Sequence, residues 1–196
     1  MSLIDRAKNI ILTPKTEWPV IAGEEPNVSQ VITAYVLPLA LIPAIASIIG
    51  YGIIGLVVTS FRWGIAMGLV EFVTALVGVY VTAFVIDFLA PNFSSQKNIG
   101  RSVQLVAYAF TPVWVAGIFY IVPALGILVL LAGIYGLYLM YLGLPVLMKT
   151  PQDKTVPYLV VSIIAVILVY WVIWMIVKVI FLGIFGLSAL TTMQGM

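Results

Sequence analysis

The feature that most constrains the fold is a series of long apolar segments separated by short polar or proline-containing connections. A helix needs about 20 predominantly apolar residues to cross the hydrocarbon core of a bilayer. Five segments meet this length, and we expect each to form one transmembrane helix. These segments are residues 28–58, 63–89, 101–122, 124–147 and 157–187.

The composition supports a membrane protein. Of 196 residues, 63% are hydrophobic and only 8% are charged, and the mean hydropathy is +1.21. Soluble domains usually carry about 25% charged residues, so this chain has too little polar surface to cover a water-facing globule. We predict an all-α membrane protein with an N-terminal segment 1–27, a single five-helix transmembrane domain 28–187 and a short tail 188–196.

Prolines divide the apolar segments, because proline lacks the N–H that a continuing helix requires. Pro38 and Pro43 predict a kink in the first transmembrane segment, and Pro112 predicts an interruption of the third. Pro123 predicts a tight hairpin between the third and fourth segments. Pro145 helps to end the fourth segment.

The N-terminal segment has the pattern of a short amphipathic helix on the membrane surface. Ser2 and Asp5 form a predicted N-cap pair, and Asn27 and Gln30 form another before the first transmembrane segment. No signal peptide is expected, because the apolar run 10–12 is shorter than the 7–15 residues of a hydrophobic region. We expect the following placements: Leu3, Ile4, Ala7, Ile10 and Ile11 on the apolar face, Asp5, Arg6, Lys8 and Asn9 away from it, Trp18 as an interfacial anchor and 24–26 as a solvated linker. The alternative is a frayed polar tail.

The basic residues indicate the orientation. Loops on the cytoplasmic side of a membrane carry an excess of Lys and Arg. With a cytoplasmic N-terminus, only Arg62 and Lys178 fall on the outer side. The cytoplasmic side then holds Arg6, Lys8, Lys15, Lys97, Arg101, Lys149 and Lys154. The sequence therefore predicts five spans with the N-terminus inside and the C-terminus outside.

The composition also excludes several kinds of chemistry. The chain has no Cys, which excludes disulfides and thiol nucleophiles, and no His, which removes the commonest metal ligand and general base. We therefore expect no catalytic residues, no metal and no cofactor. The scattered basic residues give no indication of nucleic-acid binding.

Two acidic and two basic side chains lie within or beside the predicted spans. Glu71 and Lys178 fall at similar depths, and we predict that they pair between the second and fifth segments, because an unpaired charge in the membrane is costly. Asp87 and Arg101 flank one short connection and form a second predicted pair. Each pair is either structural or part of an ion pathway.

The third segment carries a polar stripe. Gln104, Tyr108 and Thr111 follow a helical i, i+4, i+7 spacing. Pro112 deprives the Tyr108 carbonyl of its helical hydrogen bond, and such carbonyls form ion or substrate sites in broken helices. The alternative is a kink in which Thr or water satisfies this carbonyl.

Small residues predict where the helices approach closely. The motifs Gly64-x-x-x-Gly68, Ala46-x-x-x-Gly50 and Ala132-x-x-x-Gly136 lie in three different segments. We expect them to join helices within one chain. A homo-oligomer formed through such a motif is the alternative.

Two long stretches, GRSVQLVAYAFTPVWVAGIFYIVPALG (100–126) and GIYGLYLMYLGLPVLMKTPQDKTVPY (133–158), resemble the Yip domain family in its prokaryotic branch of five-span membrane proteins. The opening ILTPKTEWPVI (11–21) is similar to the N-terminal segment of those members. The resemblance implies a cytoplasmic N-terminus, five helices and the plasma (inner) membrane of a prokaryote. The eukaryotic link to Rab GTPases is not carried over, because this chain lacks the long N-terminal region and the Asp-Leu-Tyr-Gly-Pro motif. For prokaryotic members the resemblance implies no established activity.

Three functions remain open on the sequence. The first is a non-catalytic membrane protein that organises the lipid bilayer or binds a protein partner at the connections 91–101 and 148–157. The second is a small ion or proton channel or transporter that uses Glu71, Lys178 and Asp87. The third is an intramembrane enzyme acting on lipids, which the sequence favours least because nothing is placed to activate a nucleophile.

Overall fold

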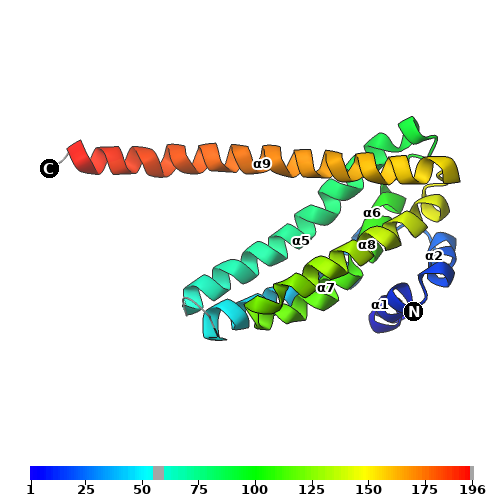
Figure 1. Cartoon of the computed structure of the whole chain (residues 1–196), viewed down its shortest axis with the longest axis horizontal. Helices are drawn as coiled ribbons and strands as arrows, with labels where there is room; N and C mark the ends of the chain where they lie inside the picture. The colour runs from blue at the N-terminus through cyan, green and yellow to red at the C-terminus, as the bar shows by residue number, and fades with distance from the viewer. Residues whose placement is uncertain (55–59, 195–196) are drawn as a thin grey trace.

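The computed structural model describes residues 1–54 and 60–194, and at positions 123, 173, 174 and 176–194 it describes the backbone alone. Every regular element in this part of the chain is helical. The transmembrane helices form a slanted bundle from which the last helix diverges, and two short N-terminal helices lie beside the bundle (Figure 1). The all-α fold predicted from the apolar segments is confirmed.

The first transmembrane span is assembled from four consecutive helical pieces. Its two π-helical turns interrupt the α-helix before Pro38 and again at its far end. A π turn is wider than an α turn. The first π turn directly precedes α4 and Pro38, whose ring would clash with the preceding turn of a regular α-helix. The predicted irregularity at Pro38 is therefore a π-helical segment. The pieces are α3 (Val28–Val31), η1 (Ile32–Val36), α4 (Leu37–Ile49) and η2 (Gly50–Ile54); residues 55–58 of the predicted span lie outside the described part.

The other four spans follow in the predicted order. Their helical pieces are α5 (Phe61–Leu89), η3 (Ala90–Phe93), α6 (Ile99–Ala109), α7 (Thr111–Ala116), η4 (Gly117–Ile121), η5 (Pro123–Leu125), α8 (Gly126–Leu147) and α9 (Gln152–Gln194). Five helices within the described residues are long and apolar enough to cross a membrane, as predicted.

Two prolines act where the sequence places them. The third span breaks at Phe110, and Pro112 lies in the first turn of α7. Val122 has extended backbone angles (φ −115°, ψ 97°) directly before Pro123, which separates the third span from the fourth. The predicted interruption and the predicted hairpin are both confirmed.

Close helix contacts form within the chain at the predicted small residues. A Cβ added at Gly64 would lie 2.7 Å from the carbonyl oxygen of Ile48, and one at Gly68 would lie 2.7 Å from that of Ala44. These two glycines therefore let α5 approach the backbone of α4. Gly136 on α8 plays the same part against α6, because a Cβ added there would lie 2.8 Å from the Ala109 carbonyl oxygen.

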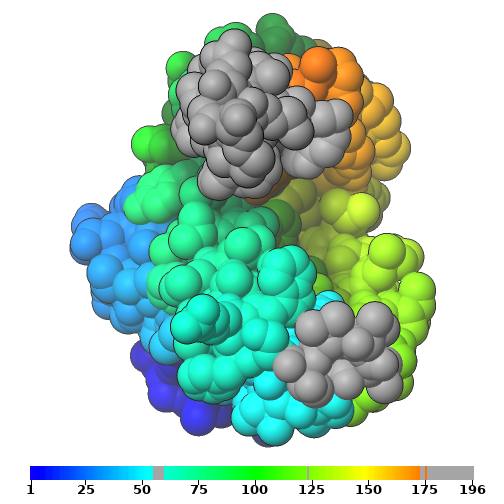
Figure 2. Space-filling model, turned by 90° about the vertical axis from the view of Figure 1, so that its left-hand side faces the viewer, coloured from blue at the N-terminus to red at the C-terminus, as the bar shows by residue number. Residues whose placement is uncertain are grey.

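The connections 94–98 and 148–151 meet at one end of the bundle, which we call the basic end because it carries Lys97 and Lys149. The Gln96 N–H donates to the Met148 carbonyl at 2.7 Å. The Ser95 hydroxyl donates to the Thr150 hydroxyl at 2.9 Å. Figure 2 views the molecule from the end opposite the basic end, where the start of α5 and the residues near position 50 lie in front.

The N-terminal helices α1 (Leu3–Leu12) and α2 (Pro14–Gly23) pack against the bundle. Both predicted N-cap pairs form: the Asp5 N–H donates to the Ser2 hydroxyl at 3.1 Å, and the Gln30 N–H donates to the Asn27 side chain at 3.0 Å. These caps begin α1 and the first span at the predicted residues.

Three placements predicted for the N-terminal segment are wrong. Arg6 is not on a solvent-facing side but is buried with only 6% of its surface exposed. Trp18 is not an interfacial anchor but is fully buried. Glu24 is not a fully solvated linker residue, because its side chain, although 43% exposed, pairs with Arg6. The physical reason is that α1 packs on α6 and α7 and α2 packs on α8, so these side chains face protein.

Candidate functional site

A polar cavity of about 560 Å³ opens at the basic end between α1, the start of the first span and α6. Three segments that are distant in the sequence form its walls, so it exists only in the folded chain. Its polar lining combines both signs of charge with neutral hydrogen-bonding groups. The lining residues are Met1, Ser2, Leu3, Arg6, Glu24, Glu25, Asn27, Gln30, Val31, Ala34, Tyr35, Gln104 and Tyr108.

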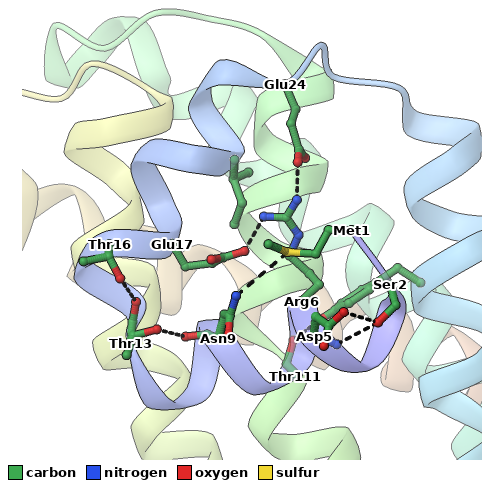
Figure 3. Close-up of polar contacts among 12 residues, drawn as sticks. Met1, Ser2, Asp5, Arg6, Asn9, Thr13, Thr16, Glu17, Glu24 and Thr111 are labelled. Atoms are coloured by element: carbon green, nitrogen blue, oxygen red, sulfur yellow. Dashed lines mark hydrogen bonds and ion pairs between the residues drawn. The ribbon is translucent and has the colours of Figure 1, made fainter.

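Arg6 is the central charge of this site. One guanidinium nitrogen donates to Glu17 at 2.5 Å and another pairs with Glu24 (Figure 3). Its guanidinium carbon lies 5.5 Å from the centre of the Tyr108 ring, which is within the range of a cation–π interaction. Since Arg6 is 6% and Glu17 is 3% exposed, each charge depends on the other to offset its desolvation.

The chain reversal at Thr13 brings Glu17 back to Arg6. The Thr13 N–H donates to the Asn9 carbonyl at 2.7 Å and closes α1, and Pro14 begins α2. Proline suits this first helical position because its fixed φ and missing N–H cost nothing there. α2 then rises from Thr13 at an angle to α1, and Glu17 points toward Arg6 (Figure 3).

Tyr35, Tyr108 and Thr111 form a hydrogen-bonded group beside the cavity. The Thr111 hydroxyl donates to the Tyr108 carbonyl at 2.7 Å and accepts from the Tyr35 hydroxyl at 2.7 Å. The two tyrosine rings meet edge to face with 4.8 Å between their centres. The carbonyl released by Pro112 is thus satisfied by Thr111, which is the structural alternative that the sequence left open.

The predicted Asp87–Arg101 pair is wrong. The Arg101 guanidinium instead donates to the carbonyls of Ile21, Ala22 and Glu24 at 3.2, 3.0 and 2.8 Å. The last carbonyls of a helix lack partners within the helix and carry partial negative charge, so the end of α2 offers Arg101 several acceptors at once. A further bond at 3.0 Å reaches the side-chain oxygen of Gln104.

Asp87 and Glu71 do not line the cavity. Asp87 is 8% exposed, and its Oδ1 atom has no hydrogen-bond partner among the described residues. Glu71 is half-buried on α5. The side chain of Lys178 lies outside the described part of the chain, so its pairing with Glu71 stays a prediction.

The sequence did not single out Arg6, Glu17, Glu24 or Tyr35 as site residues. One available signal was the Thr13-Pro14 boundary, which ends one short helix and begins another. A reversal at that boundary places a cation of the first helix near the acidic residues of the second. Without the reversal, Arg6 and Glu17 are eleven positions apart and give no local pairing pattern.

The family comparison covers most of the chain. Residues 8–175 match the model of the Yip1 domain. The chain is 26% identical over 155 residues to "Inner membrane protein YohC" of Escherichia coli strain K12, which covers 74% of this chain and 80% of that relative. The protein of the same name from E. coli O6:H1 strain CFT073 matches equally. No solved structure matches. The match to the family model, together with the five apolar helices, shows that the chain belongs to the Yip1 domain family of membrane proteins.

Proposed function

We propose that this protein is a non-catalytic, multi-pass protein of a prokaryotic inner membrane that binds a partner through its basic end, with the N-terminus in the cytoplasm. The names of the E. coli relatives support the choice of membrane. The excess of Lys and Arg at the basic end supports the orientation.

The polar cavity is the observation that carries this proposal. A cavity with a few convergent polar groups is the usual form of a ligand site, and here charged residues and amides converge on about 560 Å³. The connections 91–101 and 148–157 lie at the same end and are joined by hydrogen bonds. A partner at this end would therefore meet the cavity and both connections together.

The absence of His and Cys from the whole sequence favours binding over catalysis. The buried cation of the site, Arg6, is held by two carboxylates. Such a paired cation can orient a ligand, but it does not activate a nucleophile.

Photocrosslinking tests the proposal. The crosslinking amino acid p-benzoylphenylalanine replaces Gln30, which is exposed and lines the cavity. The control replaces Phe61, which is exposed at the start of α5. We expect a discrete adduct from position 30 in native membranes and none from position 61. Identical products from both positions would contradict a dedicated site at the basic end.

The second candidate function is ion or proton transport, and buried Asp87 favours it. A carboxylate oxygen without a hydrogen-bond partner inside a membrane bundle is costly, and such residues often mark proton or ion pathways. Purified protein in liposomes with pH- and cation-sensitive dyes tests this alternative. Flux that is lost in Asp87→Asn and Glu71→Gln but kept in Asp153→Asn, an exposed control, would favour transport over binding.

A further inference from the structure

We propose that the cavity at the basic end holds the headgroup of a phospholipid that carries a primary ammonium group, and that the acyl chains of this lipid lie along the first span. This inference names the ligand of the site described above and rests on the proposed binding function.

The charges around the cavity favour a ligand with an ammonium group. Arg6 is the one buried cation in the lining, and Glu17 and Glu24 already pair with it. Glu25 is exposed on the rim. The Met1 α-ammonium also lines the cavity, so two positive groups (Met1 and Arg6) and two carboxylates (Glu24 and Glu25) face it. Glu25 makes no ion pair with another described residue, so its carboxylate is the one that a ligand's ammonium group would meet, and the Met1 ammonium suits the phosphate of the same headgroup.

Neutral groups beside the carboxylates suit a phosphodiester. The Asn27 side-chain oxygen caps the first span, which leaves its amide nitrogen as a donor, and Gln30 provides a second amide at the rim. Tyr108 is more than nine-tenths buried and lines the cavity. Its hydroxyl makes no hydrogen bond to another residue in the described ranges, so it is available to a ligand.

The depth of the cavity matches the position of a headgroup. Its lining runs from Asn27 to Tyr35, which is about 12 Å at the rise of an α-helix. Each headgroup region of a bilayer is about 5–8 Å thick, as the difference between the full and the hydrocarbon thickness shows. The cavity therefore extends from the headgroup region into the adjacent hydrocarbon, where the glycerol of a phospholipid lies.

An apolar track continues from the cavity down the first span. Ala34 lines the cavity and is exposed, and Pro38, Leu41 and Ile45 follow it as exposed residues at helical spacing. A cavity with charged walls that opens onto an apolar track fits an amphiphile. A water-soluble metabolite would use the polar walls but gain nothing from the track.

Native mass spectrometry of the purified full chain in detergent tests the inference. The protein is titrated with phosphatidylethanolamine, phosphatidylcholine and phosphatidylglycerol of identical acyl chains. We expect phosphatidylethanolamine to bind about tenfold or more tightly than the other two, because only its primary ammonium group can both carry a positive charge and donate hydrogen bonds to a carboxylate. The trimethylammonium group of phosphatidylcholine cannot donate such bonds, and the glycerol headgroup of phosphatidylglycerol carries no positive charge.

Two variants link this preference to the cavity. Glu25→Gln should remove most of the preference for phosphatidylethanolamine, whereas Asp153→Asn, which removes an exposed carboxylate at the same end, should keep it. Gln30→Leu should weaken the binding of all three lipids. The elution volume of each variant on a sizing column confirms that it is folded.

Several results would overturn the inference. These are equal binding of the three lipids, tightest binding of phosphatidylglycerol, and a preference that persists in Glu25→Gln. Soluble phosphoethanolamine binding as tightly as the whole lipid would show that the ligand is a free metabolite. A protein adduct from position 30 without any lipid preference would overturn this inference and leave the proposed function standing, whereas the absence of both adduct and preference would overturn both.

Discussion

Gly143 on α8 is the position where the docking of the N-terminal helices can be tested most directly. A Cβ at this glycine would collide with a methyl group of Leu105 and lie 2.9 Å from two ring carbons of Trp18. Trp18 is fully buried, so its ring has no free volume into which to move. We predict that Gly143→Ala shifts the equilibrium toward an undocked α2.

The size of the effect follows from the packing. Adding a methyl group to a well-packed site costs about 1–3 kcal/mol. The higher helix propensity of Ala does not offset this cost, because α8 is a helix in the docked and undocked states alike. A change of about 1–3 kcal/mol increases the undocked population about 5- to 150-fold.

Thiol labelling measures that population. The chain contains no Cys, so a single cysteine introduced by Ala7→Cys, at a position with 8% exposure on α1, is a clean probe. It reports on α2 because the Arg6–Glu17 pair joins the two helices, so we expect α1 to undock with α2. Maleimide should label this cysteine about 5- to 150-fold faster when Gly143→Ala is also present, if labelling requires undocking and is slower than redocking.

Gly133→Ala is the matched control on the same helix. A Cβ at Gly133 would lie 4.0 Å from a Val113 methyl carbon, which is ordinary van der Waals contact. We expect its labelling rate to stay within about twofold of the parent rate, since no atom is displaced. Equal rates in Gly143→Ala and the parent would refute the argument, as would equal acceleration by both glycine substitutions.

Three further predictions concern the site and the topology. Thr111→Val removes both hydrogen bonds of the Thr111 hydroxyl and should destabilise the protein by about 1–3 kcal/mol in thermal unfolding. Tyr35→Phe removes only one of the two hydrogen bonds and should therefore destabilise the protein less. A larger loss of stability in Tyr35→Phe than in Thr111→Val would contradict this network. Arg101→Lys should increase the labelling rate of the Ala7→Cys probe several-fold, because a single ammonium group cannot reach the four acceptors that the guanidinium contacts. An unchanged labelling rate would show that the Arg101 hydrogen bonds do not hold α2 in place. In intact cells, an impermeant maleimide should label a cysteine introduced by Arg62→Cys and not one introduced by Lys97→Cys, and the opposite pattern would reverse the proposed orientation.

The order and approximate extent of the spans could be predicted from the sequence because both depend on local properties. Apolar length identifies a membrane helix without reference to its neighbours. The caps at Ser2 and Asn27 and the break at Pro112 likewise arise from residues a few positions apart. Each of these features is present in the structure where the sequence places it.

The ion cluster could not be predicted in the same way, because its partners meet only through tertiary structure. Arg6 lies at the edge of the buried face of α1, and a charged residue at such an edge usually faces water. Its burial depends on Glu17 and Glu24, which reach it only after the reversal at Thr13. Arg101 shows the same limit: Asp87 was the nearest opposite charge in the sequence, but the carbonyls of α2 are the acceptors that the fold presents.

These contacts make the first 27 residues part of the site and not an appendage to the membrane domain. Trp18 fills the space beside Gly143, Arg101 holds the last carbonyls of α2, and α1 then supplies Arg6 to the cavity. If α2 left α8, Glu17 would no longer be held against Arg6, and an unpaired buried guanidinium is strongly destabilising. Docking of α2 and formation of the cavity are therefore expected to occur together, so a substitution at Gly143 should also weaken binding at the cavity.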